Sequence, residues 1–417
     1  MELKKLLKIM GPGLLYAGAA VGVSHLVQST RAGAGYGFYL MGILILANVL
    51  KYPFFEFAPR YAASTGKSLI DGYSKIGKWA VVMFAVLSIA TMFTIQAAVT
   101  VVTAGLVGNV FGISMDAAQI SGLILFFTMI ILMVGRYAIL DKLIKIVMVV
   151  LAVSTIGATI AAMLKGYHPN PEFTKDFSWF KHADILFLIA FVGWMPAPID
   201  IATWQSLWTV AKIEEMGERP SLKNALLDFK IGYIGTAFLA VCFLSLGALV
   251  LYGSGEELSA NGVVFAGQLI SVFTDSIGNW SYYIIAIAAI TVMFSTTLTC
   301  LDAYPRVMKP LTEEFFPKLK IKKSKFDFHS WFWIVVVAAG ALVLIVYLKN
   351  SMRFMVDMAT TLSFVTAPLL AFLNYKVVTD KHMPEEGRPK LWLRVYAFIG
   401  MGFLGGFMVF YLVWRFL

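Results

Sequence analysis

Residues 194–200 read Trp-Met-Pro-Ala-Pro-Ile-Asp, and they lie inside an apolar stretch that runs from about residue 183 to residue 210. Such a stretch is long enough to cross a bilayer as a helix. Pro196 and Pro198 each remove a backbone donor and clash with the preceding turn, so a continuous helix cannot pass through them. Because hydrocarbon excludes exposed irregular backbone, the break must be buried in protein or line a cavity. Broken membrane helices of this kind commonly form the binding sites of transporters.

The composition is that of a membrane protein. Of the 417 residues, 59% are hydrophobic and 14% are charged, and the mean hydropathy is +0.79. A soluble domain has about 25% charged residues. We predict eleven membrane spans, with the approximate bounds 11–33, 37–59, 79–106, 116–135, 139–164, 183–211, 229–252, 281–306, 331–348, 354–376 and 393–415. The sequence therefore predicts an all-α, multi-pass membrane protein with a single domain over residues 1–417.

The net charge of +10 is distributed as in a membrane protein and does not indicate a nucleic-acid partner. With the N-terminus inside, Lys and Arg concentrate on one side of the membrane, which predicts a cytoplasmic N-terminus in a bacterial-type inner (plasma) membrane. The basic run at residues 318–325 either determines this topology or binds anionic lipid headgroups. Its members are Lys318, Lys320, Lys322, Lys323 and Lys325.

The sequence lacks the motifs of several other protein classes. Cys242 and Cys300 both fall in predicted spans, and their spacing indicates neither a metal site nor a disulfide framework. There is no Walker-type glycine-lysine motif, no channel filter motif and no Ser/His/Asp spacing. We therefore expect no cofactor and no enzymatic activity. Transport would have to be driven by an ion gradient or by the gradient of the substrate itself.

The first span contains a second weak point. Residues 17–25 read Ala-Gly-Ala-Ala-Val-Gly-Val-Ser-His, in which glycine lowers helix propensity and small residues permit close packing. Span 6 begins a second unit after five spans, and because five is odd, that unit would be inserted upside down. A discontinuous helix at the start of each half is typical of inverted-repeat transporters. The spacing predicts repeats over residues 11–164 and 183–376.

The chain resembles the natural resistance-associated macrophage protein (Nramp) family of divalent metal transporters over nearly its full length. The stretches that carry this resemblance are Gly11-Pro12-Gly13, Ala32-Gly33-Ala34, Thr65-Gly66-Lys67-Ser68-Leu69, Met195-Pro196 and Ser295-Thr296-Thr297-Leu298-Thr299. The resemblance implies the LeuT-type fold, with two inverted five-helix repeats, broken helices 1 and 6, and an accessory eleventh helix at residues 393–415.

Of the ligand residues in the family's binding site, the resemblance carries over only the methionine, at Met195. Counted without gaps from Gly11, the family's Asp-Pro-Gly-Asn falls on residues 22–25 and its Met-Pro-His-Asn on residues 195–198. The helix 3 acids associated with proton transfer fall on Gln96 and Val99, and the helix 10 glutamine falls near Thr361. The candidate substrate-binding residues are Gly22, Ser24, His25, Gln96, Met195, Ala197, Pro198, Asp200 and Thr361. Among these, His25, Met195 and Asp200 are the candidate metal ligands.

Asp200 and His25 each have a functional and a structural interpretation. Asp200 follows the break by two residues. It is either a displaced cation ligand or proton carrier, or a cap for the second half of the helix. His25 is a ligand or a proton-responsive group, or else a neutral imidazole bonded to a neighbouring carbonyl.

Other polar groups in the spans have simpler explanations. Asp302 is expected to pair with Arg306, and Glu56 with Arg60, because residues four apart are neighbours on a helix. Asp357 lies close to Arg353 in the sequence and is expected to be structural. Gln96 is either a polar contact of the site or a glutamine bonded to another helix.

We therefore expect a secondary carrier that works by alternating access. A metal ion is the default substrate by resemblance. A dication needs anionic or many oxygen ligands, and the family's positions hold no carboxylate in this chain, so we expect altered selectivity. Because the helix 3 acids are also missing, we expect weakened or absent proton coupling. One alternative is a carrier of an organic solute. Another is a membrane sensor that has kept the scaffold of a transporter.

Overall fold

The computed structural model describes residues 11–133, 137–316, 328–348 and 351–416. Throughout these ranges the chain forms helices joined by loops, and no strand is found in them. The basic run at residues 318–325 lies outside the described residues, as do Lys4, Lys5 and Lys8 of the N-terminal segment. The all-helical fold predicted from the composition is confirmed.

The first span is divided. Helix α2 (Pro12–Ala20) begins with a proline at its first position, where no backbone donor is lost, and it ends before Val21 and Gly22. The π-helix η1 (Ser24–Ser29) and helix α3 (Thr30–Tyr36) follow. The predicted weak point of this span is therefore a break in the helix.

The described remainder of the first half consists of four long helices and one short one. These are α4 (Met41–Thr65), α5 (Leu69–Ile76), α6 (Lys78–Val110), α7 (Ala117–Met133) and α8 (Tyr137–Lys165). The short helix α5, which the predicted spans did not include, begins with a capping box in which Ser68 and Asp71 each accept a backbone hydrogen bond from the other.

The second half begins with the other broken span, in which α9 (His182–Gly193) and α10 (Asp200–Met216) are separate helices. It continues with α11 (Leu222–Leu246), η3 (Gly247–Leu251), α12 (Gly262–Ile277), α13 (Tyr282–Phe315), α14 (Phe328–Tyr347), α15 (Met352–Thr379) and α16 (Leu391–Phe416). Short 3₁₀ turns lie at Pro171–Phe173, Asn279–Ser281 and Glu385–Gly387. Helix α12 was not among the predicted spans.

Within the described residues, eight helices are long and apolar enough to cross a membrane. Three further predicted spans consist of shorter helical segments. They are the two broken spans and the span that corresponds to α7. A break shortens each helical segment below the length of a bilayer, so these two spans cross only as pairs of half-helices.

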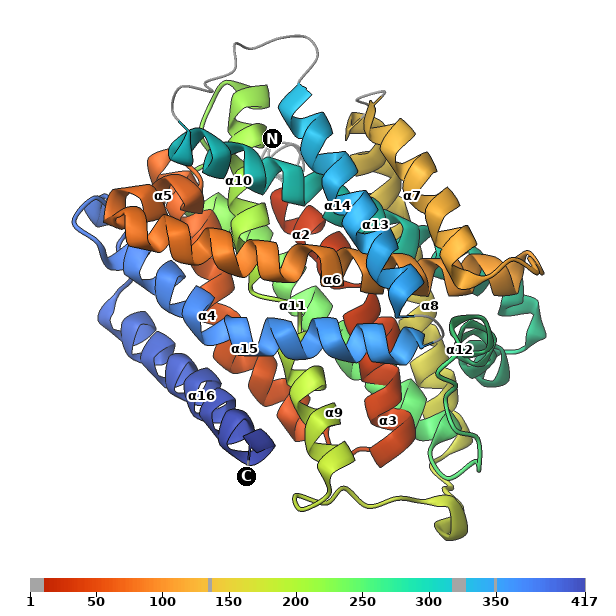
Figure 1. Cartoon of the computed structure of the whole chain (residues 1–417). Coiled ribbons are helices and arrows are strands. Elements are labelled where there is room, and N and C mark those ends of the chain that lie inside the picture. Colours follow the sequence, from red (N-terminus) through yellow and green to blue (C-terminus); the bar gives the residue numbers. More distant parts are fainter. Residues whose placement is uncertain (1–10, 134–136, 317–327, 349–350, 417) are drawn as a thin grey trace, which may run out of the picture.

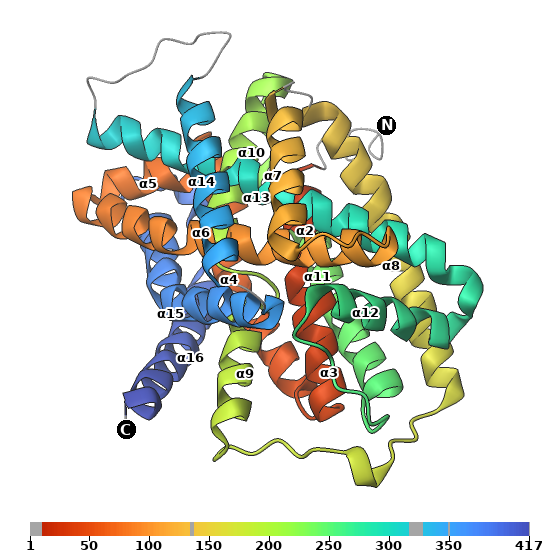
Figure 2. The same cartoon turned by 45° about the vertical axis from the view of Figure 1, so that its right-hand side comes forward.

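The two broken spans run through the middle of the bundle. Figures 1 and 2 show α3 and α9 at one end of the molecule and α2 and α10 toward the other, so the two breaks lie at a similar level. Helix α6 packs against α12, α13 and α15 across the bundle. Helix α16 lies on the outside against α4 and α15. The breaks are therefore enclosed by protein, as an interrupted membrane helix requires.

Small residues bring the first span against α11 and η3. A Cβ on Gly33 would lie 2.0 Å from the carbonyl oxygen of Leu244, and one on Gly247 would lie 2.3 Å from that of Thr30. Larger side chains at these two positions would push the backbones apart. This close approach is the packing that small residues permit in membrane helices.

Candidate functional site

The break between α9 and α10 spans residues 194–199 and contains a cis peptide bond between Met195 and Pro196. Within a helix, the N–H of residue 196 would bond to the carbonyl of Val192, but proline has no N–H to donate. The carbonyl of Val192 instead accepts from the backbone N–H of Met195 at 3.3 Å and has room for a further donor. The predicted interruption of this span is confirmed.

Side chains from two other helices hold the end of α9. The ammonium of Lys51 on α4 donates to the carbonyls of Val192 at 2.5 Å and Gly193 at 2.9 Å. The indole of Trp194 donates to Ser363 Oγ on α15 at 2.8 Å. A Cβ on Gly193 would lie 2.1 Å from the carbonyl oxygen of Thr360, so α9 and α15 are in direct backbone contact. The end of α9 is thus fixed by both neighbouring helices.

The break in the first span is stabilised by Ser24 and His25. Ser24 Oγ donates to the carbonyl of Ala20 at 2.5 Å and lies 2.7 Å from His25 Nδ1. The other ring nitrogen of His25 lies 2.9 Å from the carbonyl oxygen of Thr236 on α11. The imidazole is completely buried, and both of its nitrogens have a partner. This geometry favours the structural interpretation of His25, in which the imidazole is bonded to neighbouring groups of the protein.

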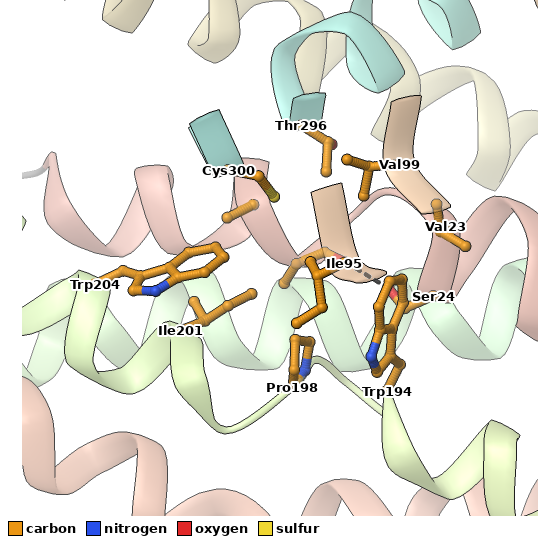
Figure 3. A pocket seen from close by; sticks show the side chains of 12 residues that line it. Val23, Ser24, Ile95, Val99, Trp194, Pro198, Ile201, Trp204, Thr296 and Cys300 are labelled. Atoms are coloured by element: carbon orange, nitrogen blue, oxygen red, sulfur yellow. Dashed lines mark hydrogen bonds between the residues drawn. The ribbon is translucent and has the colours of Figure 1, made fainter. Parts of the chain in front are cut away.

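A chamber lies between the two breaks. Figure 3 shows the side chains that surround it, which come from α2, α6, α10, α13 and the two breaks. The lining residues are Ala19, Ala20, Val23, Ser24, Ile95, Val99, Trp194, Pro198, Ile201, Trp204, Thr296 and Cys300. The walls are mostly apolar, and their polar side-chain groups are two hydroxyls, one thiol and the indole N–H groups of Trp194 and Trp204. All twelve residues are buried, so the chamber is closed in this structure.

The structure places two of the predicted site residues, Ser24 and Pro198, in the lining of this chamber. Gly22 supports it from behind, because a Cβ at that position would lie 2.8 Å from the hydroxyl of the lining residue Thr296. Ala197 is buried in the break outside the lining. Thr361 is partly exposed on α15, also outside the lining.

Gln96 and Met195 are bonded elsewhere. The Gln96 amide donates to Thr100 Oγ1 at 3.1 Å and to the carbonyl of Thr297 on α13 at 3.3 Å. The sulfur of Met195 accepts from Ser29 Oγ at 3.7 Å. Neither residue lines the chamber.

The candidate metal ligands do not form a conventional metal centre. Over the described residues, no group of three or more His, Cys, Asp and Glu side chains is placed to hold a metal ion. His25 bonds to Ser24 and Thr236, while Met195 contacts Ser29. Of the three candidate metal ligands, Asp200 differs in that its two carboxyl oxygens are not bonded to a neighbouring side chain or carbonyl in this way.

Asp200 is the first residue of α10, is 2% exposed and stands just outside the chamber lining, next to the lining residue Ile201. The N-cap of this helix is Ile199 and no side chain accepts a capping hydrogen bond, so Asp200 does not cap the helix. Neither carboxyl oxygen makes a hydrogen bond of good geometry among the described residues, and the donors nearest to it are the Thr91 hydroxyl and the backbone N–H of Asp200 itself. The carboxyl group lies close to Thr91 and to the phenols of Tyr73 and Tyr304.

The polar environment of Asp200 was not found from the sequence. The Tyr304 hydroxyl, like the carboxyl group, is buried without a partner in the described part of the chain. The Tyr73 hydroxyl donates to Asn374 Oδ1 at 2.5 Å and lies 3.4 Å from Thr203 Oγ1. These groups come from α5, α10, α13 and α15, and nothing in their local sequences relates them.

The two expected ion pairs are confirmed. Asp302 pairs with Arg306 at 2.7 Å. Glu56 pairs with Arg60 at 2.5 Å. Asp357, which was expected to be structural, forms an ion pair with Arg31 of α3 at 2.6 Å. The sequence distance of 326 residues hid this contact. Lys51 was also missed, although a lysine in the middle of an apolar span was a visible signal.

The chain is similar to known membrane proteins along its whole length. The family model described as natural resistance-associated macrophage protein-like matches residues 13–414. An uncharacterized protein of Pasteurella multocida is 35% identical over 407 residues, which cover 97% of this chain and 91% of that protein.

Solved structures share the fold at low sequence identity. A manganese transporter from Eremococcus coleocola, in complex with an aromatic bis-isothiourea compound, has a TM-score of 0.69 and 14% identity, covering 98% of this chain and 87% of that one. MhsT in complex with L-phenylalanine has a TM-score of 0.61 and 16% identity, covering 96% and 98%. Mhp1, a nucleobase-cation-symport-1 family transporter with bound bromovinylhydantoin, has a TM-score of 0.60 and 12% identity, covering 95% and 90%. At these identities the likeness shows the fold alone.

Proposed function

Because the chain belongs to the natural resistance-associated macrophage protein-like family and is a membrane transporter, we propose that it is a secondary carrier which binds its substrate between the two helix breaks. Alternating access would open the chamber first to one side of the membrane and then to the other. The closed chamber between α2, α6, α10 and α13 supports this mechanism. The carrier would lie in the plasma membrane with its N-terminus in the cytoplasm.

The proposed substrate is a metal cation, and the buried carboxyl group of Asp200 carries the proposal. A carboxylate enclosed at membrane depth is costly without a partner, and removing one partner from a buried ion pair costs about 3–5 kcal/mol. Asp200 has no hydrogen-bond partner within the described ranges, yet it stands at the start of α10, where the helix dipole favours a negative charge. A bound cation would supply the missing positive charge.

The selectivity should differ from that of a manganese transporter such as the Eremococcus coleocola protein. Manganese and iron sites use several carboxylate, imidazole or thioether donors. Here the hydroxyl groups of Thr91 and Tyr304 lie near Asp200, while His25 and Met195 are engaged in other contacts. This donor set suits a cation that keeps part of its hydration shell.

The test is a comparison of Asp200→Asn with the wild-type protein. We expect one of manganese, magnesium, calcium or sodium ions to raise the unfolding temperature of the wild type and to enter proteoliposomes that contain it. Asp200→Asn removes the negative charge, so the affinity for that ion should fall at least about a hundredfold. Asp116→Asn is the matched control, because Asp116 is exposed at the start of α7 and Asn caps a helix equally well.

A wild-type protein that responds to none of these cations would overturn the metal proposal. The apolar lining of the chamber then favours the second candidate, a small organic solute. Organic ligand sites are mostly apolar with a few polar groups, and Trp194 and Trp204 both line this one. A panel of organic solutes in the same unfolding assay separates the two candidates, because a selective shift with a solute alone would support the second.

Proton coupling should be weak. The positions of the family's helix 3 acids are occupied by Gln96, which is bonded within the protein, and by Val99, which lines the chamber. Neither side chain takes up a proton at physiological pH. A pH-sensitive dye inside the proteoliposomes should therefore show little proton movement during uptake, and robust co-transport would contradict this part of the proposal.

A further inference from the structure

Lys51 is buried in the middle of α4, where it contacts the end of α9. Its side chain is 0% exposed. Its ammonium donates to two backbone carbonyls at the end of α9, those of Val192 and Gly193. Over the described residues, no carboxylate forms an ion pair with it. A lysine at membrane depth without a countercharge is costly, so its position requires an explanation.

The end of α9 provides the compensating negative potential. The last carbonyls of a helix have no partner within it and carry the negative end of the helix dipole. At this end Pro196 supplies no donor, so the carbonyl of Val192 accepts a long backbone hydrogen bond from Met195, at 3.3 Å, and its other lone pair accepts from Lys51. Two carbonyl oxygens at 2.5 and 2.9 Å from one ammonium form a binding place for a monovalent cation.

In transporters with broken helices, unwound carbonyls and the C-terminal ends of half-helices are where alkali ions bind. We propose that the ammonium of Lys51 is a built-in cation, which occupies the carbonyl end of α9 in place of a bound alkali ion. It also ties α9 to α4, while Trp194 and Gly193 tie the same end to α15.

This arrangement places a basic and an acidic group at the two ends of the break. The lysine ammonium stands at the negative end of α9, and the carboxyl group of Asp200 stands at the positive end of α10. One consequence rests on the proposed carrier function: the transport cycle needs no separate alkali ion at the end of α9. Lys51 is thus a positioning residue, since it acts on the backbone of α9 and does not line the chamber.

The test uses Lys51→Ala, which removes the ammonium and leaves the two carbonyls beside an empty space. The unfolding temperature of the purified full-length variant should be several degrees below that of the wild type in N-methylglucamine chloride. Sodium, potassium or methylammonium chloride should restore it in a saturable manner, because a ligand that binds only the folded state stabilises it. The wild type should show no such response at the α9 end. Its unfolding temperature should be the same in these salts as in N-methylglucamine chloride. A response of the wild type that disappears in Asp200→Asn is assigned to the proposed substrate site and does not count here.

Lys51→Met is the matched control. Methionine fills much of the same space with an unbranched apolar chain and brings no charge. It should be destabilised and should gain little from added cations, because its side chain blocks the vacated position. If Lys51→Ala does not fold, Lys51→Met still tests the charge, and a methionine variant as stable as the wild type would overturn the inference.

A double variant separates this inference from the proposed function. In Lys51→Ala combined with Asp200→Asn, stabilisation by monovalent cations should persist, because the two sites are distinct. Loss of that stabilisation would place the cation at Asp200 and overturn the role of Lys51. A folded Lys51→Ala protein that no monovalent cation stabilises would overturn it as well. A wild type that transports no cation would instead contradict the proposed function alone.

Discussion

At the scale of single residues, the site is defined by which polar atoms are already bonded. His25 has a partner at each ring nitrogen, while both oxygens of Asp200 have none among the described residues. A buried polar group without a partner costs free energy, so a ligand is expected where such atoms gather. The two residues look equally functional in the sequence, and their contacts distinguish them.

His25 is therefore expected to contribute to stability. His25→Ala should lower the free energy of unfolding by about 1–3 kcal/mol, because the Thr236 carbonyl and Ser24 each lose a buried hydrogen-bond partner. The measurement is thermal unfolding of the purified protein, with the exposed His168→Ala as control. The pH dependence of uptake should keep its shape. A flattened pH profile with unchanged stability would instead favour the proton-responsive interpretation.

At the scale of the elements, the half-helices are held by contacts with α4, α11 and α15. The outer contact of α3 is the ion pair between Arg31 and Asp357 of α15, in which the guanidinium also lies 5.0 Å from the ring centre of Phe187 on α9. Gln28 donates to the same carboxylate and to Thr360. These contacts join both broken spans to α15 at one end of the molecule.

Breaking this ion pair should open the chamber from that end. In a background with Ser24→Cys and Cys300→Ala, where the introduced cysteine is the one thiol among the chamber's lining residues, Arg31→Ala should increase the rate of labelling by a membrane-impermeant thiol reagent several-fold. Lys175→Ala is the matched control, because Lys175 pairs with Glu257 in exposed loops away from the chamber. Equal labelling rates in the two variants would show that the ion pair does not close the chamber.

At the scale of the whole molecule, the arrangement implies a defined topology. Two inverted repeats over residues 11–164 and 183–376, followed by the accessory helix, remain our proposal for the internal organisation. With the N-terminus in the cytoplasm, the loop that contains Glu172 would lie outside and the loop that contains Glu218 inside. Both residues are exposed at their loops.

Cysteine labelling in intact cells checks this topology. Glu172→Cys should react with an impermeant reagent added outside, whereas Glu218→Cys should react only after the membrane is permeabilised. The two native cysteines are buried, which keeps the background low. The reverse pattern would mean that the chain is inserted the other way, and the assignment of sides made from the basic residues would be wrong.

The sequence alone determined the spans and the two interruptions, because these depend on local properties. Hydropathy over some 20 residues decides whether a segment enters the membrane. Pro196 and Pro198 exclude a continuous helix at any place in the fold, and the glycines near residue 22 weaken one. The pairs Asp302–Arg306 and Glu56–Arg60 were also predictable, since residues four apart meet on any helix.

Only the tertiary structure decided which polar groups are bonded and which are free. Lys51 lies 141 residues from Val192, and His25 lies 211 residues from Thr236. Such pairs meet because helices from different parts of the chain pack together, and no local pattern records that packing. The chemistry of the site depends on these long-range contacts, since each hydrogen bond made inside the protein removes a donor or acceptor from the substrate.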